Sequence, residues 1–477
     1  MTDGTRYRPP KAAQVPGASI AATRDEHHTN VVGRTASLSA DNTFNGEASV
    51  GSNIAIIGTG YVGLTTGACL ASLGHTVVCA DVIPEKVESL QRGVIPILEA
   101  GLEELVREGL ASGQLSFVLG AAAAVSDVEF IYLCVPTPQG DDGSADLSYI
   151  QSAAAEIGPL IAPESVVINK STVPVGSTLV VEKALGRSDV FVVSNPEFLR
   201  EGSAVHDFLH PDRVVIGADD QGAAIRVAGL YLGLAAPLQV TNPASAETIK
   251  YASNAFLATK ISFVNAIAAV CEAVGADVND VVLGMGYDKR IGEAFLRPGP
   301  GWGGSCFPKD SRALVRIAEN AGYDFGLLKG VIAVNEEQFE LVADKIERMA
   351  GGSLKGRIVT VWGLTFKART DDLRDSPSLQ VIRRLVDRGA VVKAFDPSVK
   401  DGSDPRLAGI EVSADPYAST EGAEVLAILT EWDEFRWLDF DKVAATMAAP
   451  RVVDARNLLD RNALRRRGFA YEGLGRA

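Results

Sequence analysis

The sequence has few cysteines, and its five are scattered without the paired spacings of a disulfide framework or a zinc site. We therefore expect a reducing compartment, the cytoplasm. Histidine is equally scarce: His206 and His210 lie four residues apart, but no third ligand is apparent, so a solvated helix face explains them better than a metal site. No apolar run of membrane-spanning length is evident, and no charged segment followed by an apolar stretch predicts a signal peptide.

Basic charge is also in deficit, because 45 Lys and Arg face 60 Asp and Glu for a formal net charge of −15. This balance argues against a nucleic-acid partner. It does not exclude a small anionic ligand, which needs only a local cationic pocket.

With 477 residues, the chain is too long for a single core, so we expect several domains. Residues 1–50 are rich in Ser, Thr, Ala, Asn and Gly without apolar periodicity, which predicts a disordered tail. In 51–240, apolar strands alternate with helices in the manner of a doubly wound α/β sheet. The region 241–340 opens with a long helical pattern, about 243–274, that carries one continuous apolar stripe, and we expect this helix to join the two halves. A second strand–helix–strand unit fills 341–477, ending its second strand at an aspartate as the first unit does.

The most informative segment is Gly-Pro-Gly-Trp-Gly-Gly-Ser-Cys-Phe-Pro-Lys-Asp at 299–310. Pro308 suits the first turn of a helix, which would place Cys306 at a helix N-terminus beside Lys309 and on one face with Asp310. The helix dipole and the lysine would both favour the thiolate, so we interpret Cys306 as a nucleophile. The alternative is a small packing residue in a glycine-rich turn. The other four cysteines lie in apolar runs and are expected in cores.

A second signal follows the apolar strand at 54–57. The segment Gly58-Thr-Gly60-Tyr-Val-Gly63 precedes a helix, and a second strand ends at Asp81. This is the dinucleotide-binding fingerprint in its full context. The glycines, with Tyr61 and Val62, would let a pyrophosphate approach the helix N-terminus, and Asp81 would bind ribose hydroxyls and repel a 2′-phosphate, which predicts NAD rather than NADP. A glycine-rich turn without a ligand is the alternative.

Together the two signals describe a nicotinamide dehydrogenase with a covalent cysteine. The chain resembles the UDP-glucose/GDP-mannose dehydrogenase family in six blocks that follow one another in the family's order. They are Lys-Ser-Thr-Val-Pro at 170–174, Ser-Asn-Pro-Glu-Phe-Leu-Arg-Glu-Gly at 194–202, Glu-Thr-Ile-Lys-Tyr-Ala-Ser-Asn at 247–254, Arg-Ile-Gly at 290–292, the cysteine segment at 299–310, and Gly-Leu-Thr-Phe-Lys-Ala-Arg-Thr-Asp-Asp-Leu-Arg at 363–374. The resemblance covers about residues 53–475. It implies two Rossmann-like domains joined by the central helix, the second of which binds a nucleotide sugar. It also implies oxidation of a primary alcohol to a carboxylate, with two NAD per sugar and a thioester on Cys306.

Spacing and resemblance together suggest catalytic roles. Lys250 and Asn254 would project from one helical face to stabilise an oxyanion, although Lys250 alone would be read as a solvent lysine. Asp310 would orient a water or act as a base; a helix-terminus carboxylate is its alternative. The resemblance implies that Glu197 serves thioester hydrolysis; its alternative role is a salt bridge in a loop. For Thr172 it implies that the side chain holds a catalytic water, and capping of the helix that follows is the alternative.

The resemblance also implies binding contacts. For the cofactor these are Lys86, Thr137, Thr172, Glu201, Lys309 and Arg374. For the nucleotide sugar they are Glu197, Phe198, Leu199, Arg200, Lys250, Asn254, Arg290, Gly303, Lys309, Phe366 and Lys367. Surface ion pairs are the alternative for the cations, and a core ring for Phe366. In the family the arginine that matches Arg290 comes from the partner subunit, so we expect at least a homodimer.

The resemblance leaves the sugar open. The segment 195–202 followed by His-Pro-Asp-Arg at 210–213 is more similar to the branch that takes UDP-glucose, but GDP-mannose and a UDP-N-acetylhexosamine remain alternatives. A nucleotide-binding regulatory protein without catalysis is the alternative from another class. The presence of every expected catalytic residue argues against it.

Overall fold

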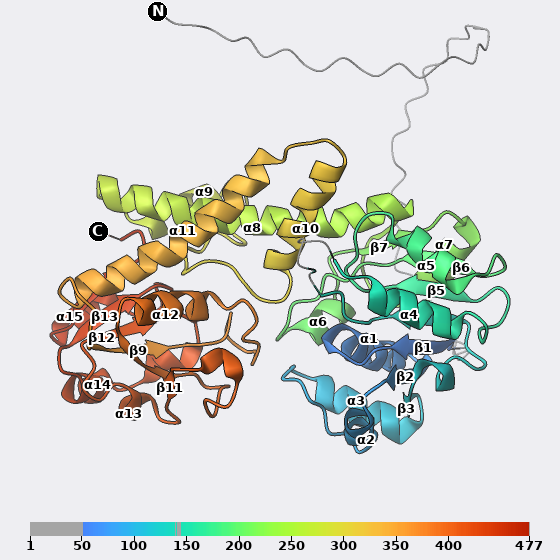
Figure 1. The fold of residues 1–477 in the computed structure, drawn as a ribbon, viewed down its shortest axis with the longest axis horizontal. Coiled ribbons are helices and arrows are strands. Elements are labelled where there is room, and N and C mark those ends of the chain that lie inside the picture. Colours follow the sequence, from blue (N-terminus) through green and yellow to red (C-terminus); the bar gives the residue numbers. More distant parts are fainter. Residues whose placement is uncertain (1–50, 139, 141–144, 477) are drawn as a thin grey trace, which may run out of the picture. The chain divides into compact units, whose positions relative to one another are not determined.

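The computed structural model describes residues 51–138, 140 and 145–476, so the tail predicted to be disordered lies outside the described residues. Two α/β halves follow one another along the chain, with a group of helices between them in sequence (Figure 1). The first half contains β1 (Asn53–Ile57), α1 (Tyr61–Ser72), β2 (Thr76–Asp81), α2 (Pro84–Gln91), α3 (Leu102–Ser112), β3 (Leu115–Leu119), η1 (Ala121–Ala123), β4 (Phe130–Leu133), α4 (Ser148–Ile157), β5 (Val166–Asn169), α5 (Ser177–Leu185), β6 (Phe191–Ser194), α6 (Ala204–Leu209), β7 (Val214–Gly217), α7 (Gln221–Gly229) and β8 (Leu238–Thr241).

The first sheet has eight strands within the described residues, in the order β3-β2-β1-β4-β5-β6-β7-β8. Its strands run parallel except where β6 meets β7. The order of its first six strands is that of a dinucleotide-binding fold, with a reversal between β1 and β4. Ile54 and Ile56 of β1 pack on one face with α1, and Ala55 and Ile57 on the other with α4. Both faces are therefore covered, and the predicted doubly wound sheet is confirmed.

The second half repeats this arrangement. It contains β9 (Ile358–Trp362), α12 (Pro377–Asp387), β10 (Val391–Phe395), η2 (Pro405–Leu407), β11 (Glu411–Val412), α13 (Pro416–Ser419), β12 (Val425–Ile428), η3 (Asp433–Trp437), α14 (Phe440–Thr446), β13 (Arg451–Asp454), α15 (Arg461–Arg466) and β14 (Ala470–Gly473). Within the described residues its six strands are all parallel, in the order β11-β10-β9-β12-β13-β14.

The two halves share their first turn in detail. Gly58 and Gly363 follow the first strand of each sheet with φ of 96° and 94°, and each N–H donates over 2.8 Å to the carbonyl that precedes the aspartate. Asp81 and Asp396 then accept hydrogen bonds from that turn. The indole of Trp432 also donates to Asp396, which is 2% exposed. The aspartate of the second half is therefore enclosed by its own protein.

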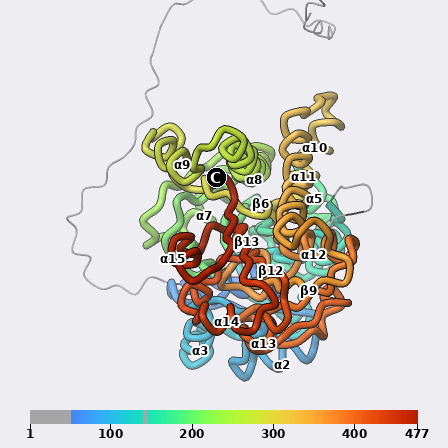
Figure 2. Tube along the Cα trace, turned by 90° about the vertical axis from the view of Figure 1, so that its left-hand side faces the viewer, coloured from blue at the N-terminus to red at the C-terminus, as the bar shows by residue number. Residues whose placement is uncertain are grey.

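Four helices connect the halves: α8 (Pro243–Val274), α9 (Val278–Gly286), α10 (Phe307–Asn320) and α11 (Gly326–Met349). The helix predicted over 243–274 coincides with α8, and the predicted pair of Rossmann-like units joined by a long central helix is confirmed. The last described residues lie against these helices and are hydrogen-bonded to them (Figure 2). The Gly475 N–H donates to Glu272 over 2.7 Å, and the Val278 N–H donates to the Gly475 carbonyl over 2.8 Å.

The apolar stripe predicted on α8 lies largely on the exposed side of the helix. Its large members face outward, with Phe256, Phe263 and Val270 exposed by 65%, 51% and 55%. The buried side of α8 instead carries small and polar residues, among them Lys250 and Asn254. Small side chains let α10 and α11 pack closely against that side, and the polar ones belong to the site described below.

The expectation of no membrane-length apolar segment also needs correction. By length and composition alone, α8 would suffice to cross a membrane, with 32 residues and a mean hydropathy of 1.5 over its best window. Its buried Lys250 and Asn254 and its packing against α10 and α11 are those of an internal connecting helix.

Candidate active site

A cavity of about 1020 Å³ opens at the carboxyl ends of β1 and β4, where the strand order reverses. Open α/β sheets bind their ligands at this point. The sequence-predicted residues that line it are Gly58, Gly60, Tyr61, Val62, Asp81, Lys86, Thr137, Thr172, Glu197, Leu199, Glu201, Cys306, Lys309 and Arg374. Those outside its immediate lining are Gly63, Phe198, Arg200, Lys250, Asn254, Arg290, Gly303, Asp310, Phe366 and Lys367.

The three glycines of the first turn have different reasons to be glycine. A Cβ at Gly58 would lie 2.6 Å from the Cys134 carbonyl oxygen, and one at Gly63 would collide with the Gly58 carbonyl. A Cβ at Gly60 would meet no protein atom within 4 Å. Gly58 and Gly63 are therefore fixed by the fold, whereas Gly60 leaves open space at the start of α1. These residues fit the pyrophosphate of a dinucleotide.

Asp81 is tied into this turn. Its Oδ2 accepts hydrogen bonds from the Thr59 N–H (3.0 Å) and hydroxyl (2.6 Å), and Lys86 Nζ lies 2.8 Å away. Burial opposes ionisation, but Lys86 and Thr59 outweigh it and lower the pKa of Asp81 to about 2. Lys86 is therefore part of the cavity rather than a free surface lysine, and Asp81 has a constant charge with a cation beside it.

Cys306 immediately precedes α10, and the Asp310 N–H donates to its carbonyl over 2.9 Å, as the sequence predicted. The expected activating cation is wrong, because Lys309 Nζ pairs with Asp310 at 2.8 Å. Burial raises the pKa of the Cys306 thiol, and the opposing cation is Lys250. The prediction that the thiolate is favoured is therefore wrong as well: the neutral thiol is favoured, because desolvation exceeds the effect of Lys250.

Lys250 and Glu197 form a buried ion pair beside Cys306, with Nζ 2.7 Å from Oε1 and side chains 5% exposed. The Leu199 N–H donates to the other oxygen of Glu197 over 2.7 Å. Burial would raise the pKa of Glu197, but Lys250 and these hydrogen bonds lower it below its ordinary value. Burial would lower the pKa of Lys250, yet its anionic neighbours raise it. Lys250 is therefore no solvent lysine, and the salt bridge considered for Glu197 lies inside the site.

Asn254 lies one turn beyond Lys250 on the buried side of α8, so the predicted shared face is confirmed. Its Nδ2 donates to Asp310 Oδ2 over 2.6 Å. Asp310 is fully buried, and its other oxygen accepts from Lys309. Both carboxylate oxygens of Asp310 are thus occupied by protein donors.

Thr172 does not cap the following helix, because α5 begins at Ser177 and its N-cap is Gly176. The Thr172 carbonyl accepts a hydrogen bond from the Thr137 hydroxyl over 2.9 Å. Both threonines line the cavity. The role of capping residue is therefore excluded for Thr172, and its position at the cavity wall remains.

Glu201 is a carboxyl group with an unfilled hydrogen-bonding position. Its Oε1 accepts from the Ser305 hydroxyl over 3.0 Å and lies 3.2 Å from Arg374, while its buried Oε2 has no hydrogen-bond partner among the described residues. Burial and the charge of Asp372 raise the pKa of Glu201 to about 7. Sequence reasoning missed Ser305 and Asp372, although both lie within the quoted blocks.

Phe366 and Lys367 come from the turn after β9. A Cβ at Gly304 would lie 2.8 Å from the Phe366 ring, and the Lys367 ammonium lies 5.2 Å from the centre of that ring. A Cβ at Gly303 would collide with the Asp375 carbonyl. The second half thus lies directly against the glycines of the cysteine segment, and Phe366 is a half-buried ring beside the site rather than a core residue.

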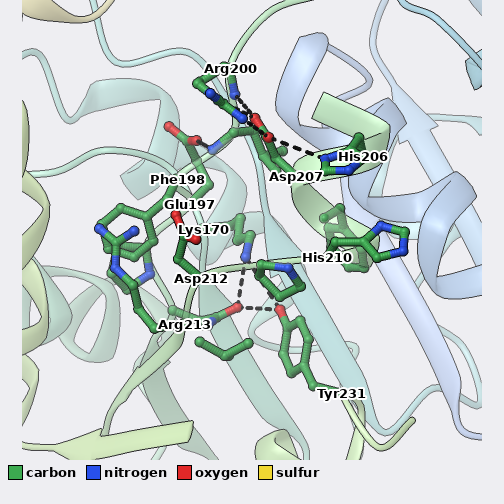
Figure 3. A pocket seen from close by; sticks show the side chains of 16 residues that line it. Lys170, Glu197, Phe198, Arg200, His206, Asp207, His210, Asp212, Arg213 and Tyr231 are labelled. Atoms are coloured by element: carbon green, nitrogen blue, oxygen red, sulfur yellow. Dashed lines mark hydrogen bonds and ion pairs between the residues drawn. The ribbon is translucent and has the colours of Figure 1, made fainter. Parts of the chain in front are cut away.

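A second, smaller cavity of about 150 Å³ lies on the other side of Glu197 (Figure 3). Arg213 stacks on Phe198 with its guanidinium 3.6 Å from the ring centre, and Arg200 Nε donates to Asp207 over 2.9 Å. These contacts give Arg200 and Phe198 protein partners. Arg290 is 89% exposed and paired with Asp288, so this chain does not bring it to Cys306.

The described residues contain no group of three or more His, Cys, Asp or Glu that could hold a metal ion. The rings of His206 and His210 stack with their centres 4.8 Å apart, and His206 is 70% exposed.

Three family models match the chain, all from the UDP-glucose/GDP-mannose dehydrogenase family. The NAD binding domain matches 52–235, the central domain 244–337 and the UDP binding domain 360–461. The chain is similar to the UDP-glucose 6-dehydrogenase of Rhizobium meliloti, with 46% identity over 435 residues that cover 89% of this chain and 99% of the relative. UDP-glucose 6-dehydrogenase TuaD of Bacillus subtilis is 45% identical over 429 residues, covering 89% and 93%.

Solved structures agree. A UDP-glucose dehydrogenase from the hyperthermophilic archaeon Pyrobaculum islandicum superposes with a TM-score of 0.85 and 39% identity, covering 91% of this chain and 100% of that one. A UDP-D-ManNAc dehydrogenase from Pyrococcus horikoshii reaches 0.79 at 27% identity, covering 89% and 99%.

Proposed function

The chain belongs to the UDP-glucose/GDP-mannose dehydrogenase family, and we propose that it oxidises C6 of UDP-glucose to a carboxylate with two molecules of NAD and a thioester on Cys306. The observation that carries this proposal is the half-buried Cys306 beside the buried ion pair of Lys250 and Glu197, at the end of an NAD-binding sheet. Relatives between 40% and 46% identical over 89% of the chain are UDP-glucose 6-dehydrogenases, which supports the choice of sugar.

Bound NAD supplies the hydride acceptor for both oxidations. The chain holds it by the open turn at Gly60, by Asp81 and Lys86 at the end of β2, and by the buried Glu201 at the catalytic end. The free oxygen of Glu201 marks a position where a ligand donor would complete the hydrogen bonding.

The covalent step starts from a neutral thiol. The Cys306 sulfur forms a bond to the C6 aldehyde carbon, and the thiol proton ends on the former carbonyl oxygen, giving a thiohemiacetal. Lys250 and Asn254 lie on one side of α8, where an ammonium and an amide can stabilise that oxygen while it carries negative charge. Loss of a hydride from C6 and of the hydroxyl proton then gives the thioester. The covalent bond also prevents the aldehyde from escaping.

Hydrolysis completes the reaction. Water attacks the thioester carbon, the carbon–sulfur bond breaks, and the sulfur recovers its proton as the carboxylate forms. We assign Glu197 as the base that accepts the proton of this water, because its low pKa keeps it ionised at neutral pH. Asp310, bound by Asn254 and Lys309, holds these donors in place.

We divide the chain accordingly: 51–240 binds the cofactor, 241–340 carries catalytic residues between the halves, and 341–477 binds the nucleotide sugar. The match of a UDP binding domain over 360–461 supports the last assignment. We place the enzyme in the cytoplasm, supported by five cysteines that are all free.

The test of this function is NADH formation by the full chain with UDP-glucose, GDP-mannose and UDP-N-acetylmannosamine in parallel. We expect kcat/KM for UDP-glucose to exceed the others by at least about a hundredfold, because rejecting an added or inverted substituent in a fitted pocket is worth roughly 3 kcal/mol. Equal or greater activity with another nucleotide sugar would make that sugar the substrate instead of UDP-glucose. The absence of NADH formation with every sugar would refute the proposed dehydrogenase activity.

Cofactor choice gives a further prediction. Asp81→Asn is expected to reduce the preference for NAD over NADP by roughly tenfold or more, since the 2′-phosphate would no longer meet a negative charge and Lys86 would become free to bind it. The preference is measured as the ratio of kcat/KM values. Lys86→Met is the matched control, and its preference for NAD over NADP should be equal to or stronger than that of the wild type. An unchanged ratio in Asp81→Asn would show that Asp81 does not select the cofactor.

We propose that the outward stripe of α8 is the interface of a homodimer. Phe256, Phe263 and Val270 repeat at spacing of seven residues on one helix face, and an apolar row of this kind is typical of helix pairing. Arg290 follows α9 and is exposed, so a partner subunit could receive it. The substrate site would then be completed across the dimer.

Phe263→Asp is accordingly expected to give a monomer whose activity is lower by at least about tenfold, because buried charge disfavours the interface and the arginine is lost. Light scattering after size-exclusion chromatography measures the mass. Leu232→Asp, at a site 76% exposed beyond α7, is the control and should change neither. A monomeric wild type with full activity would refute the shared site.

A further inference from the structure

Lys170 is a buried cation that the reaction scheme above does not use. It follows β5 and is 5% exposed. Its Nζ donates to Asn195 Oδ1 over 2.9 Å and to the Tyr231 hydroxyl over 3.3 Å, and it lies 5.7 Å from the centre of the Tyr231 ring. Figure 3 shows Lys170 and Tyr231 with Glu197 in the lining of the small cavity, to which Asn195 also belongs.

The partners of Lys170 are neutral. Among the described residues it forms no ion pair with a carboxylate, although leaving an ammonium group buried without a counter-charge is costly. Glu197 is a carboxylate that lines the same cavity as Lys170, and it follows Asn195 by two residues. Lys170 is thus linked to the Glu197 segment through its hydrogen bond to Asn195, and its charge acts on the Glu197 carboxylate.

Asn195 makes this link rigid. It is fully buried, its Nδ2 donates to the Val215 carbonyl on β7 over 2.8 Å, and its Oδ1 accepts from both Lys170 and the Tyr231 hydroxyl. Every polar atom of its side chain is therefore used. The start of the Asn-Pro-Glu segment is fixed between β5 and β7, which determines where Glu197 can lie.

We propose that Lys170 is a positioning residue for the hydrolytic step: with Lys250 it keeps Glu197 ionised, and through Asn195 it holds the segment that presents this carboxylate to the thioester. The inference rests on the proposed function, because it assigns Lys170 to the step in which Glu197 acts. The arrangement that carries it is a buried Glu197 that lines both cavities, pairs directly with Lys250, and shares the smaller cavity with Lys170.

The charged and titratable groups around Glu197 come from several elements. Lys250 lies on α8, Lys170 after β5, Cys306 before α10 and Cys134 after β4, and Arg213 precedes β7 in the small cavity. Burial would raise the pKa of Glu197, whereas Lys250 most, then the Leu199 N–H, and finally Lys170 lower it. Removing the Lys170 charge must therefore raise the pH below which Glu197 becomes protonated and inactive as a base.

The test is the rate of thioester decay in single turnovers, followed by acid quench and intact-protein mass across pH, with the two NADH bursts recorded separately. Lys170→Met is expected to slow the decay by roughly threefold at about pH 4.5 and to match wild type at about pH 7, because the pKa of Glu197 moves up from below its ordinary value. The bursts count folded, active sites, so decay rates are compared per active site. Glu201 and the acylated Cys306 are the same in both proteins and do not contribute to the difference.

Two further variants make the result decisive. Lys170→Arg keeps the charge, so the midpoint of its pH profile for thioester decay should lie within about half a pH unit of the wild-type midpoint. In the Glu197→Gln background, Lys170→Met should add less than about a twofold further loss, because the group it acts on is gone. The proposal would be overturned if Lys170→Met slowed thioester decay equally at every pH, or slowed it as much in the Glu197→Gln background as in the wild type. It would also be overturned if the pH midpoint of Lys170→Arg shifted as far as that of Lys170→Met. Absence of NADH bursts in the wild type would instead refute the proposed function.

Discussion

Cys306→Ser is expected to lower kcat by at least about a thousandfold while leaving the affinities for NAD and UDP-glucose within about threefold of wild type. A serine alkoxide forms far less readily than a thiolate, and Lys250, the cation that most opposes the effect of burial at residue 306, cannot make up that difference. Steady-state NADH formation gives kcat, and titration calorimetry gives the affinities.

Cys271→Ser is the matched control. Cys271 is buried on α8 in a small apolar cluster with Val278, so its replacement tests the cost of a serine without touching the site. It should retain kcat within about twofold. Near-normal production of the carboxylate by Cys306→Ser would remove this residue from the mechanism. A tenfold or greater loss of affinity for either ligand would show that the residue is needed for binding.

The pair Glu197→Gln and Glu201→Gln is expected to separate hydrolysis from cofactor binding. Glu197→Gln keeps the shape of the side chain and removes the base, so thioester decay should fall by about a hundredfold or more while the first hydride transfer changes little. Glu201→Gln should instead raise KM for NAD, because its carboxyl lies beside Ser305 and Arg374 and its second oxygen has no protein partner. Pre-steady-state NADH bursts and the mass of the trapped enzyme distinguish the two effects.

A reversed result would exchange the two roles. Burial raises the pKa of Glu201 to about 7, which also suits a base that works near neutral pH, and Glu201 accepts a hydrogen bond from Ser305, the neighbour of Cys306. Accumulation of the thioester in Glu201→Gln but not in Glu197→Gln would assign hydrolysis to Glu201. Loss of even the first burst in Glu197→Gln would move that residue to an earlier step.

Much of the fold follows from local patterns. The strand predicted at 54–57 differs from β1 (Asn53–Ile57) by one residue, and the second strand ends at Asp81 as predicted, because apolar runs followed by glycine or aspartate are typical of the buried strands of a parallel sheet. The faces of α8 were not predictable in the same way. Periodicity marks the large apolar residues, but it cannot tell whether they meet the same chain or another, and here the chain buries the small and polar side instead.

The candidate site likewise contains residues that local sequence predicted and residues that only the fold brings together. Motif spacing placed Asp81 beside the glycine turn, because the two lie at the ends of the neighbouring strands β1 and β2, whereas the family resemblance implied that Cys306 belongs to the same site. It named the wrong cation for Cys306, since Lys309 is adjacent in sequence while Lys250 is brought by the fold. Burial decides the ionisation of Cys306 and Glu201, and burial is a property of the assembled halves that no spacing reveals.

The most direct test of the covalent mechanism is the mass of the wild-type enzyme quenched in acid during turnover with UDP-glucose and excess NAD. The account predicts a sugar-nucleotide adduct on the peptide that contains Cys306, two NADH formed per UDP-glucose consumed, and no free aldehyde captured by hydroxylamine. One NADH per sugar, with the aldehyde released and Cys306 unmodified, would contradict it.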